Sequence, residues 1–205
     1  MIIGIVGFIG SGKDTVADYL VNSHTFRRDS FAATLKDAVA IVFNWDRELL
    51  EGRTIQAREW REQVDPWWAD RLNMPGLTPR TVLQQWGTEV LRNGFHDDIW
   101  IASIENKFRT NQTDIVISDC RFPNEIKLIK NAGGKVIWVR RGPLPIWYNT
   151  ALNANINCSE PAIAELQQLG IHSSETAWVG AEFDAIVDND GSISDLYNTV
   201  KSLVQ

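Results

Sequence analysis

The sequence predicts a three-layer α/β fold, in which a five-stranded parallel sheet has helices on both faces. Apolar runs of strand length alternate with helical patterns along the chain, and the first run ends in a glycine-rich turn. Charged and polar residues directly follow several of the apolar runs. Because ligands of such sheets bind at the carboxyl ends of the strands, those polar residues are the first candidates for a site.

The expected strands are short apolar runs, at residues 2–6, 26–31, 114–118, 135–141 and 184–189. The expected helices show 3.6-residue periodicity, at residues 14–23, 33–45, 80–92, 98–108 and 123–134, with one more near the C-terminus. Thr78 with Pro79 is a good helix start, and Ser192 with Asp195 resembles a capping box.

Two stretches are less regular. Residues 45–78 are polar and aromatic, and we expect helices there. Residues 143–176 are polar and mixed, contain three prolines, and are interpreted as a mobile excursion. Six tryptophans lie between residues 45 and 100, and they serve either as packing surface or, for one or two, as a pocket wall for a flat ring.

Composition limits the function classes. With 205 residues, of which 44% are hydrophobic, the chain is expected to form one globular domain with a full core. A net charge of -6 gives no general reason to bind a nucleic-acid backbone, so we expect no nucleic-acid partner. No apolar run reaches 18 residues, and the start "MIIGIVGFIG" has no basic flank, so we expect neither a membrane span nor a signal peptide.

The two cysteines, Cys120 and Cys158, are too few for a disulfide framework, and they are expected to be reduced thiols in a cytoplasmic setting. The sequence does not fix the oligomeric state and is compatible with a homodimer.

The stretch "GFIGSGKDT", residues 7–15, follows the first strand and has the spacing of a phosphate-binding loop. Such a loop surrounds an anion with backbone N–H groups and a helix N-terminus, and Lys13 would reach the β- and γ-phosphates. The residue after the lysine is usually Ser or Thr, which binds magnesium, but here it is Asp14, followed by Thr15. The plainer interpretation is a glycine turn with an exposed lysine.

Asp14 is charged and would repel phosphates unless a cation lay between them, so it is a candidate ligand of Mg²⁺, directly or through water. Asp119, which ends an apolar strand, is the second candidate ligand; otherwise it is a strand-terminating cap. Asp119 with Arg121, Arg140 with Arg141, and residues 189–191 also follow strands. Together with the glycine loop they are predicted to meet at one edge of the sheet.

Seven motifs then point to a family: "GSGKDT", "SFAATLK", "PRTVLQQWGTE", "DIW", "SDCRFPNE", "HSSE" and "DNDGSISDL". Together they resemble the phage-type deoxynucleoside monophosphate kinases, a branch of the P-loop nucleoside and nucleotide kinases. The resemblance spans residues 2 to about 200 and is weakest over 45–75 and 143–170. That branch shares the Asp after the loop lysine. "GKDT" also occurs in some phosphomevalonate kinases, so the loop alone does not choose the substrate.

The resemblance implies the P-loop kinase fold with strand order 2-3-1-4-5, an acceptor-binding helical region at 32–110, and a lid at 143–176. The cofactors implied are ATP and Mg²⁺. The donor residues implied are Gly10, Ser11, Gly12, Lys13, Asp14, Thr15, Arg140, Asn189 and Gly191.

The acceptor would be a deoxynucleoside monophosphate. The residues implied to face it are Lys36, Arg80, Gly87, Thr88, Trp100, Arg121 and Glu125, and helical spacing adds Gln84. Spacing supports part of this set, because residues 84, 87 and 88 lie one and two helical turns beyond Arg80 on nearly one face. Lys36 and Arg141 have plainer interpretations as surface charges, and His172 with Glu175 as a helix cap.

The expected reaction is ATP-dependent conversion of a deoxynucleoside monophosphate to the diphosphate, which supplies deoxynucleoside triphosphate synthesis. An acceptor phosphate oxygen is already anionic, so catalysis needs positioning and charge neutralisation by Lys13, Arg121 and Arg141, without an obligatory general base.

The motifs leave two alternatives. A GTP-dependent switch would need N-K-x-D to read guanine, but "NKFR" at 106–109 lacks the Asp, and "DNDG" at 188–191 lies too near the C-terminus for a switch loop. A P-loop kinase for another small phosphate ester, such as phosphomevalonate or dephospho-coenzyme A, is the closer alternative. The tryptophan-rich region favours a flat base over an isoprenoid.

Overall fold

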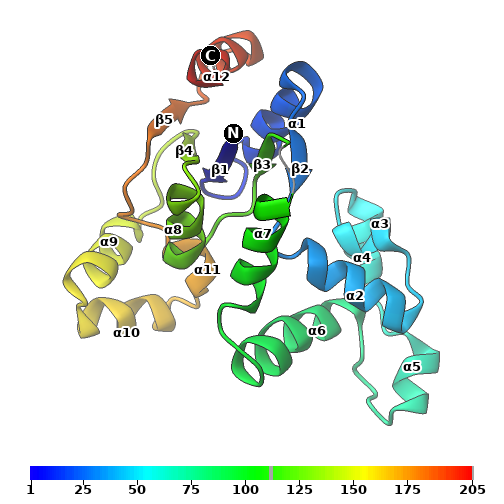
Figure 1. The fold of residues 1–205 in the computed structure, drawn as a ribbon. Helices are drawn as coiled ribbons and strands as arrows, with labels where there is room; N and C mark the ends of the chain where they lie inside the picture. The colour runs from blue at the N-terminus through cyan, green and yellow to red at the C-terminus, as the bar shows by residue number, and fades with distance from the viewer. Residues whose placement is uncertain (111–112, 205) are drawn as a thin grey trace. The chain divides into compact units, whose positions relative to one another are not determined.

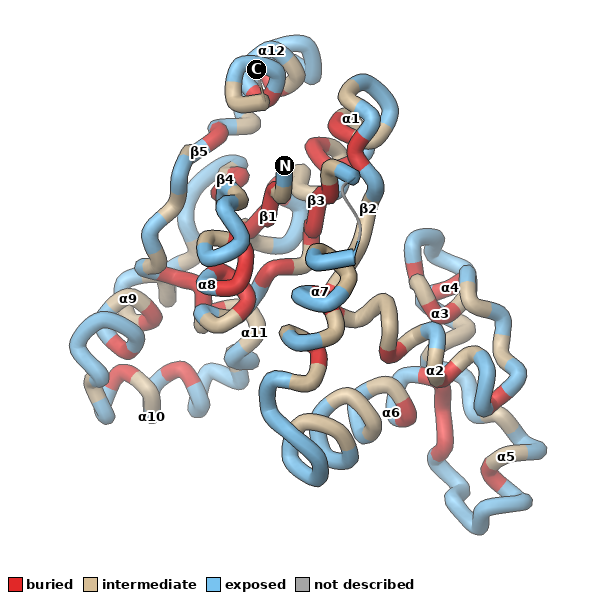
Figure 2. The backbone as a smooth tube through the Cα atoms, viewed as in Figure 1, coloured by how far each residue is buried: buried red, intermediate tan, exposed pale blue. Residues whose placement is uncertain are grey.

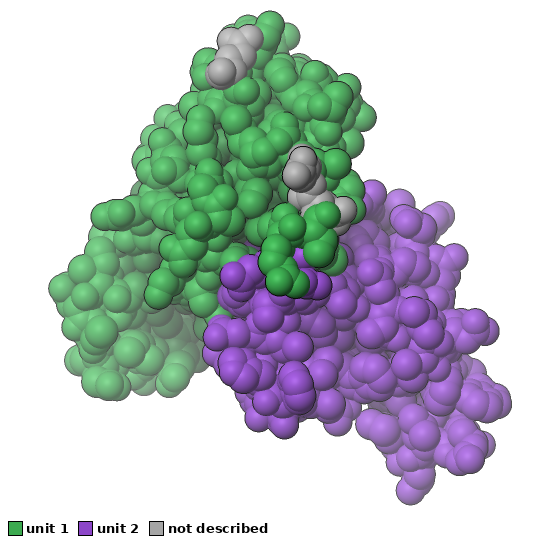
Figure 3. Space-filling model, viewed as in Figure 1, with its two compact units in different colours: residues 1–30, 107–205 green, residues 31–106 purple. Residues whose placement is uncertain are grey.

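The computed structural model describes residues 1–110 and 113–204, which cluster into two compact units (Figure 3). Unit 1 combines residues 1–30 with 107–205, and unit 2 comprises residues 31–106. The chain therefore leaves the first unit after the second strand and returns within a helix. The inserted unit covers most of the region that was expected to bind the acceptor.

The sheet of unit 1 has five strands in the order β2-β3-β1-β4-β5, and all neighbours are parallel (Figure 1). The strands are β1 (Ile2–Val6), β2 (Arg27–Asp29), β3 (Ile115–Ile117), β4 (Lys135–Arg140) and β5 (Ala185–Asp188). This confirms the predicted fold class and strand order. Since all strands run the same way, their carboxyl ends share one edge.

The helices of unit 1 cover both faces of this sheet. They are α1 (Lys13–His24), α8 (Pro123–Asn131), α9 (Tyr148–Asn157), α10 (Glu160–Gln168), α11 (Ser173–Thr176) and α12 (Ile193–Val204). Alternate residues of β1 point to opposite faces, so Ile3 and Ile5 pack with α1 and α12, whereas Gly4 faces Ile129 of α8. A Cβ on Gly4 would collide with the Ile129 side chain, so glycine permits this close approach.

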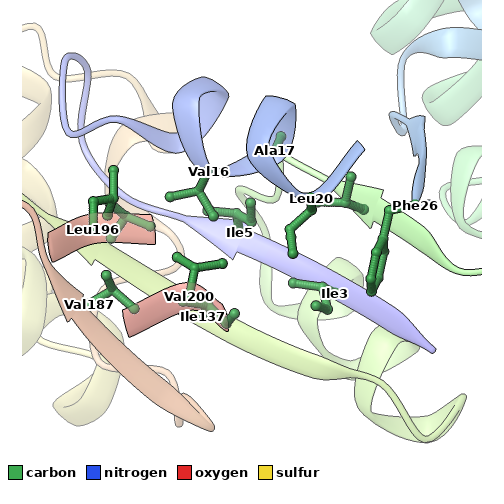
Figure 4. Packing of buried hydrophobic residues seen from close by; sticks show 12 residues of the cluster. Ile3, Ile5, Val16, Ala17, Leu20, Phe26, Ile137, Val187, Leu196 and Val200 are labelled. Atoms are coloured by element: carbon green, nitrogen blue, oxygen red, sulfur yellow. The ribbon is translucent and has the colours of Figure 1, made fainter. Parts of the chain in front are cut away.

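The core between α1, α12 and the sheet is mainly aliphatic, with Phe26 at one end (Figure 4). Its side chains from β1 and α1 are fully buried, and the central strands are red throughout most of their length in Figure 2. The capping box that opens α12 is confirmed, because the Asp195 carboxylate accepts from the Ser192 N–H and Oγ, and Ser192 Oγ accepts from the Asp195 N–H.

The predicted excursion at 143–176 consists largely of three helices, α9 to α11. Asn155 donates two hydrogen bonds, to the carbonyl groups of Thr176 and Val179, which joins α9 to the segment after α10. Phe8 of the glycine loop packs against Trp147 of the excursion, with ring centroids 5.4 Å apart. The excursion is thus packed onto the loop, and its action as a lid stays a prediction.

Unit 2 is helical. Its elements are α2 (Ala33–Phe43), α3 (Arg47–Glu51), α4 (Ile55–Glu62), α5 (Pro66–Arg71), α6 (Pro79–Gln84), the π-helix η1 (Gln85–Asn93) and most of α7 (Ile99–Thr110). Five of its six tryptophans pack in or against one core. Trp67 is the exception, with 62% of its surface exposed. Packing therefore accounts for most of the tryptophan-rich stretch.

The helix that was expected over 80–92 begins as predicted and then changes character. Thr78 caps it, and Thr81 completes a reciprocal capping box. From Gln85 onward the helix is a π-helix, with hydrogen bonds one residue longer than in an α-helix. The α-helical spacing used to place Gly87 and Thr88 on the face of Arg80 therefore does not hold beyond Gln84.

Candidate functional site

The glycine loop connects β1 to α1 and is built for close approach of an anion. Gly10 and Gly12 have φ values of 79° and 101°, which favour glycine. No described atom lies within 4 Å of a Cβ built on Gly10, so the loop is open there. Gly12 is the N-cap of α1, and no described side chain caps that helix end. The first N–H groups of α1 therefore have no intrahelical acceptor and can bind phosphate oxygens.

Lys13 is held inside its own loop. Its Nζ donates to the carbonyl oxygens of Gly7, at 2.8 Å, and Phe8, at 2.9 Å. Burial lowers the pKa of Lys13, and the positive charge of Arg121 adds to this effect. A phosphate bound near Lys13 would offer this ammonium group a negative partner in place of two neutral carbonyl groups.

Other loop residues are in place but differ in environment. Ser11 is buried, and its Oγ has no hydrogen-bond partner among the described residues. Asn189, which follows β5, donates to the Ser11 carbonyl at 2.9 Å, so this residue braces the loop. A Cβ on Gly12 would collide with the same amide. Thr15 is half-buried in the first turn of α1. Gly191 lies against the Asp195 side chain, near the start of α12.

A pocket adjoins the loop at the carboxyl ends of β1 and β3. Its walls combine charged and apolar groups, from Gly7, Ile9, Lys13, Asp119, Cys120, Arg121, Ser174, Glu175 and Trp178. It brings together three residues that the sequence predicted for the site: Lys13, Asp119 and Arg121. The fourth charged group, Glu175, was considered only as a helix cap.

Arg121 is tied to α11. Its Nη1 donates to Glu175 at 3.3 Å and to Ser174 Oγ at 3.2 Å. His172 caps α11, because its Nδ1 accepts from the Ser174 N–H. The cap interpretation thus describes His172, whereas Glu175 is the internal partner of Arg121. Only the tertiary fold shows this pairing, because the two residues lie 54 positions apart.

Glu125, expected beside the acceptor, is 3% exposed and accepts from the backbone N–H groups of Arg121 and Phe122. It therefore stabilises the start of α8 and the backbone that carries Arg121. Cys120 and Cys158 are both free thiols, as expected. Burial raises the pKa of the Cys120 thiol well above its ordinary value, with Glu125 and Asp119 adding to the effect, which disfavours the nucleophilic thiolate form.

Arg140 ends β4 and forms a two-pronged ion pair with Asp188 of β5, at 2.6 and 2.8 Å. The side-chain hydrogen bonds of this pair raise the pKa of Arg140 and lower that of Asp188. Arg140 also lies over the Trp138 ring, 5.3 Å from its centroid. Arg141 is exposed and forms no ion pair within the described residues.

Asp14 differs most from its expected setting. It is paired with Arg28 of β2, and Ser118 Oγ lies 3.4 Å from the same carboxylate oxygen. Within the described ranges, 1–110 and 113–204, no group of three or more His, Cys, Asp and Glu side chains is arranged to hold a metal ion. The cation beside Asp14 in this structure is a guanidinium group that the sequence reasoning did not select.

The basic residues of unit 2 form their own arrangement. Lys36 and Arg47 both pair with Glu51, at 2.9 and 2.7 Å. Although burial alone would raise it, hydrogen bonds from these two cations hold the pKa of Glu51 at about 2. Arg80 pairs with Glu62 at 3.0 Å.

Arg61, of α4, was not predicted for the site. It forms no ion pair in the part of the chain that the structure describes, and its Nε is buried without a partner there. Burial lowers the pKa of Arg61, and the charges of Arg80 and Arg58 add to this effect, while those of Glu62 and Glu51 oppose it. A half-buried guanidinium group that forms no ion pair within the described residues is an anion-binding candidate. No sequence signal separates Arg61 from the other arginines of residues 45–78.

The remaining acceptor candidates differ in exposure. Gln84 and Thr88 are exposed, whereas Trp100 is 6% exposed and its Nε1 donates to the Gly87 carbonyl at 2.9 Å. A Cβ on Gly87 would lie 2.9 Å from Leu35 of α2, so this glycine permits helix packing. These contacts give Trp100 and Gly87 structural roles, and their place in an acceptor site stays a prediction. No described helix has the length and apolarity to cross a membrane.

Comparisons with known proteins agree with the motifs. The family model described as deoxynucleotide monophosphate kinase matches residues 70–145. The chain is 29% identical to a putative deoxynucleotide monophosphate kinase of Acanthamoeba polyphaga mimivirus, over 100% of this chain and 96% of the relative. It is 26% identical to the deoxynucleoside-5'-monophosphate kinase of Escherichia phage T5, over 63% of this chain and 72% of that protein.

Among solved structures, a shikimate kinase from Aquifex aeolicus aligns over 100% of this chain and 96% of its own, with 12% identity and a TM-score of 0.48. The fold assignment rests on the strand order of this chain itself. The sequence matches confirm the resemblance that the motifs predicted.

Proposed function

We propose that this relative of the deoxynucleotide monophosphate kinases transfers the γ-phosphoryl group of ATP to a deoxynucleoside monophosphate. The products are ADP and a deoxynucleoside diphosphate. The observation that carries the proposal is the meeting of Lys13, Asp119 and Arg121 in one pocket beside an open glycine loop. The matching family model and both viral relatives are named for kinases of deoxynucleoside monophosphates, which favours a nucleotide acceptor over another phosphate ester.

The chemistry needs no proton acceptor. An oxygen of the acceptor phosphate attacks the γ-phosphorus, and the bond from that phosphorus to the β,γ-bridging oxygen breaks. Lys13 and the N–H groups at the start of α1 would hold the donor phosphates, while Arg121 would hold the acceptor phosphate near them. To do so, Lys13 leaves the Gly7 and Phe8 carbonyls, and Arg121 exchanges Glu175 for phosphate.

Magnesium, when bound, would neutralise phosphate oxygens. Asp119 lines the same pocket as Lys13 and Arg121, and Asp14 is not part of that lining. We therefore propose Asp119 as the principal protein ligand, with Asp14 acting through water. Few carboxylates and several waters suit Mg²⁺. Arg140 and Arg141 would contact donor phosphates, and the residues after β5 would lie against adenine.

The acceptor would be bound through unit 2, by the predicted residues Lys36, Arg80, Gln84 and Thr88. We add Arg61, because it is half-buried and has no carboxylate partner among the described residues. Planar guanidinium groups bind phosphate through two parallel hydrogen bonds, which an ammonium group cannot do.

We place the reaction in the cytoplasm, that of the host if a phage encodes the chain, where it would supply deoxynucleoside triphosphate synthesis.

The test is a panel of common deoxynucleoside and ribonucleoside monophosphates with MgATP, read as ADP formed. We expect turnover with at least one deoxynucleoside monophosphate and less with its ribose counterpart. Dephospho-coenzyme A and phosphomevalonate belong in the same panel. If either of them is phosphorylated and no nucleoside monophosphate is, this proposal is wrong and the protein is a kinase for another small phosphate ester.

A further inference from the structure

Arg28 of β2 makes three side-chain hydrogen bonds near the glycine loop. Its Nη1 donates to Asp18 at 2.8 Å, and its Nη2 contacts both Asp14 and Ser118 Oγ, the latter at 2.7 Å. Its side chain is 21% exposed, whereas that of Asp14 is 77% exposed. The arginine is thus held in place, and the carboxylate that it contacts is open to solvent.

The side-chain contacts of Arg28 place its guanidinium group beside the loop. β2 pairs in parallel with β3, with Arg28 opposite Val116, the middle residue of β3. From there the side chain reaches Ser118, the residue after β3, and so extends toward the carboxyl end of that strand. Ser118 follows β3, and Asp14 is the second residue of α1, next to Lys13. All three partners of Arg28 therefore come from elements that border the loop, and all belong to unit 1.

This arrangement answers the electrostatic problem of Asp14. A carboxylate one residue beyond Lys13 is negatively charged and would therefore repel bound phosphates. In the usual phosphate-binding loop, a neutral hydroxyl group occupies that position. The first turn of a helix favours an acidic residue, but that effect does not remove the repulsion from several phosphate charges. A cation fixed against the carboxylate does, and Arg28 is such a cation whether or not a metal ion is present.

We propose that Arg28 is a positioning residue of the donor site, the fixed counter-ion that makes Asp14 compatible with a bound triphosphate. The proposal rests on the proposed use of the glycine loop for ATP. It couples two residues: Arg28 matters to ATP binding because Asp14 is charged, and it should matter little once Asp14 is neutral.

The test is a double-mutant cycle on the full chain, read as the Kd for ATP by calorimetry without Mg²⁺ and again with it. R28Q should weaken metal-free ATP binding about tenfold, because the Asp14 charge is then uncompensated beside the phosphates. Without Mg²⁺, D14N should bind ATP as tightly as wild type does, or slightly more tightly, because the repulsion between the Asp14 carboxylate and the phosphates is removed. The double variant R28Q/D14N should return to within about twofold of D14N.

D18N is the matched control, since Asp18 also pairs with Arg28 but lies one helical turn further from the loop. It should leave ATP binding unchanged. R28K, which keeps the charge, should recover most of the affinity that R28Q loses. Magnesium should reduce the difference in ATP affinity between R28Q and wild type, because a metal ion can partly replace the positive charge of Arg28.

The inference is overturned if R28Q binds ATP as wild type does, or if R28Q/D14N binds as weakly as R28Q. Should R28Q alone fail to fold, the comparison of R28Q/D14N with D14N decides: a tenfold difference between them overturns the inference, and near equality supports it. If the wild type binds no ATP at all, the proposed function itself is wrong. If the wild type binds ATP and R28Q binds it with equal affinity, only the proposed role of Arg28 is wrong.

Discussion

The positive charges beside the glycine loop of unit 1 have internal partners, whereas one of the neighbouring arginines 58, 61 and 80 of unit 2 does not. Near the loop, Lys13 is bound to two carbonyl groups, Arg28 to Asp14 and Asp18, and Arg121 to Glu175. In unit 2, Arg61 is half-buried beside other arginines and forms no ion pair within the described residues. One region satisfies its cations internally, and the other leaves one cation unsatisfied.

The difference separates two ways of binding phosphate. A cation with an internal partner must release that partner when phosphate binds, so part of the favourable binding free energy is lost. At such a site, backbone N–H groups provide much of the affinity for phosphate. A half-buried cation without a partner is destabilising until an anion reaches it, so it gains the full interaction. We therefore expect Lys13 and Arg121 to act more on turnover and Arg61 to act on affinity.

The largest effect is expected at Lys13. Lys13→Ala removes the ammonium group that would stabilise charge on the transferred phosphoryl group, and kcat should fall by about 10²-fold or more. Steady-state ADP formation measures it, with circular dichroism to verify the fold. Lys127→Ala, an exposed lysine of α8, is the control and should keep wild-type kcat. A folded Lys13→Ala enzyme with unchanged kcat would remove the loop from the donor site.

The next effect concerns Arg121 and its internal partner. Arg121→Lys loses the planar guanidinium, and kcat should fall roughly tenfold while the acceptor KM rises. Glu175→Gln instead frees Arg121 from its ion pair, so binding of a deoxynucleoside monophosphate without ATP should become tighter by a fewfold. If Glu175→Gln weakens that binding, the carboxylate contributes to the site directly and the proposed exchange of partners is wrong.

Arg61 tests the other side of the comparison. Arg61→Gln should weaken binding of the monophosphate about tenfold and leave ATP affinity unchanged, because its charge is proposed to serve the acceptor alone. Arg53→Gln is the matched control, since Arg53 is an exposed arginine of the same unit. Calorimetric titration of each variant with monophosphate and with ATP separates the two effects. An Arg61→Gln variant that binds the monophosphate normally would leave Arg61 as a packing residue.

Much of the fold could be predicted because its signals are local. Strand runs, the glycine loop and the caps at Thr78 and Ser192 depend on residues within a few positions of one another. The sheet order followed from the resemblance that those motifs support. The π-helix after Gln84 carries no such signal, and the α-helical spacing therefore failed there.

The partners within the site could not be read in the same way. The stretch "FRRDSF" predicts a strand, and alternation places Arg27 and Arg28 on opposite sides of it, but nothing local says which one meets Asp14. The pairing of Arg121 with Glu175 likewise needs the fold of residues 143–176. The sequence thus indicated the phosphate loop and its lysine, and the tertiary structure was needed to find the charges that compensate them.

The smallest effect concerns the stability of unit 2. Glu51 contrasts with Arg61, because this carboxylate pairs with two cations, whereas Arg61 forms no ion pair within the described residues. Its pKa is about 2 rather than the ordinary 4.5, since Lys36 and Arg47 both pair with it. A depressed pKa stabilises the fold above pH 4.5, and this contribution is lost as the pH falls toward 2. Thermal unfolding of Glu51→Gln should therefore occur several degrees below that of wild type at pH 7, and the gap should close near pH 2, with Glu48→Gln of the same helix as the exposed control. A gap of constant size across that range would mean that Glu51 stabilises unit 2 by packing rather than by charge.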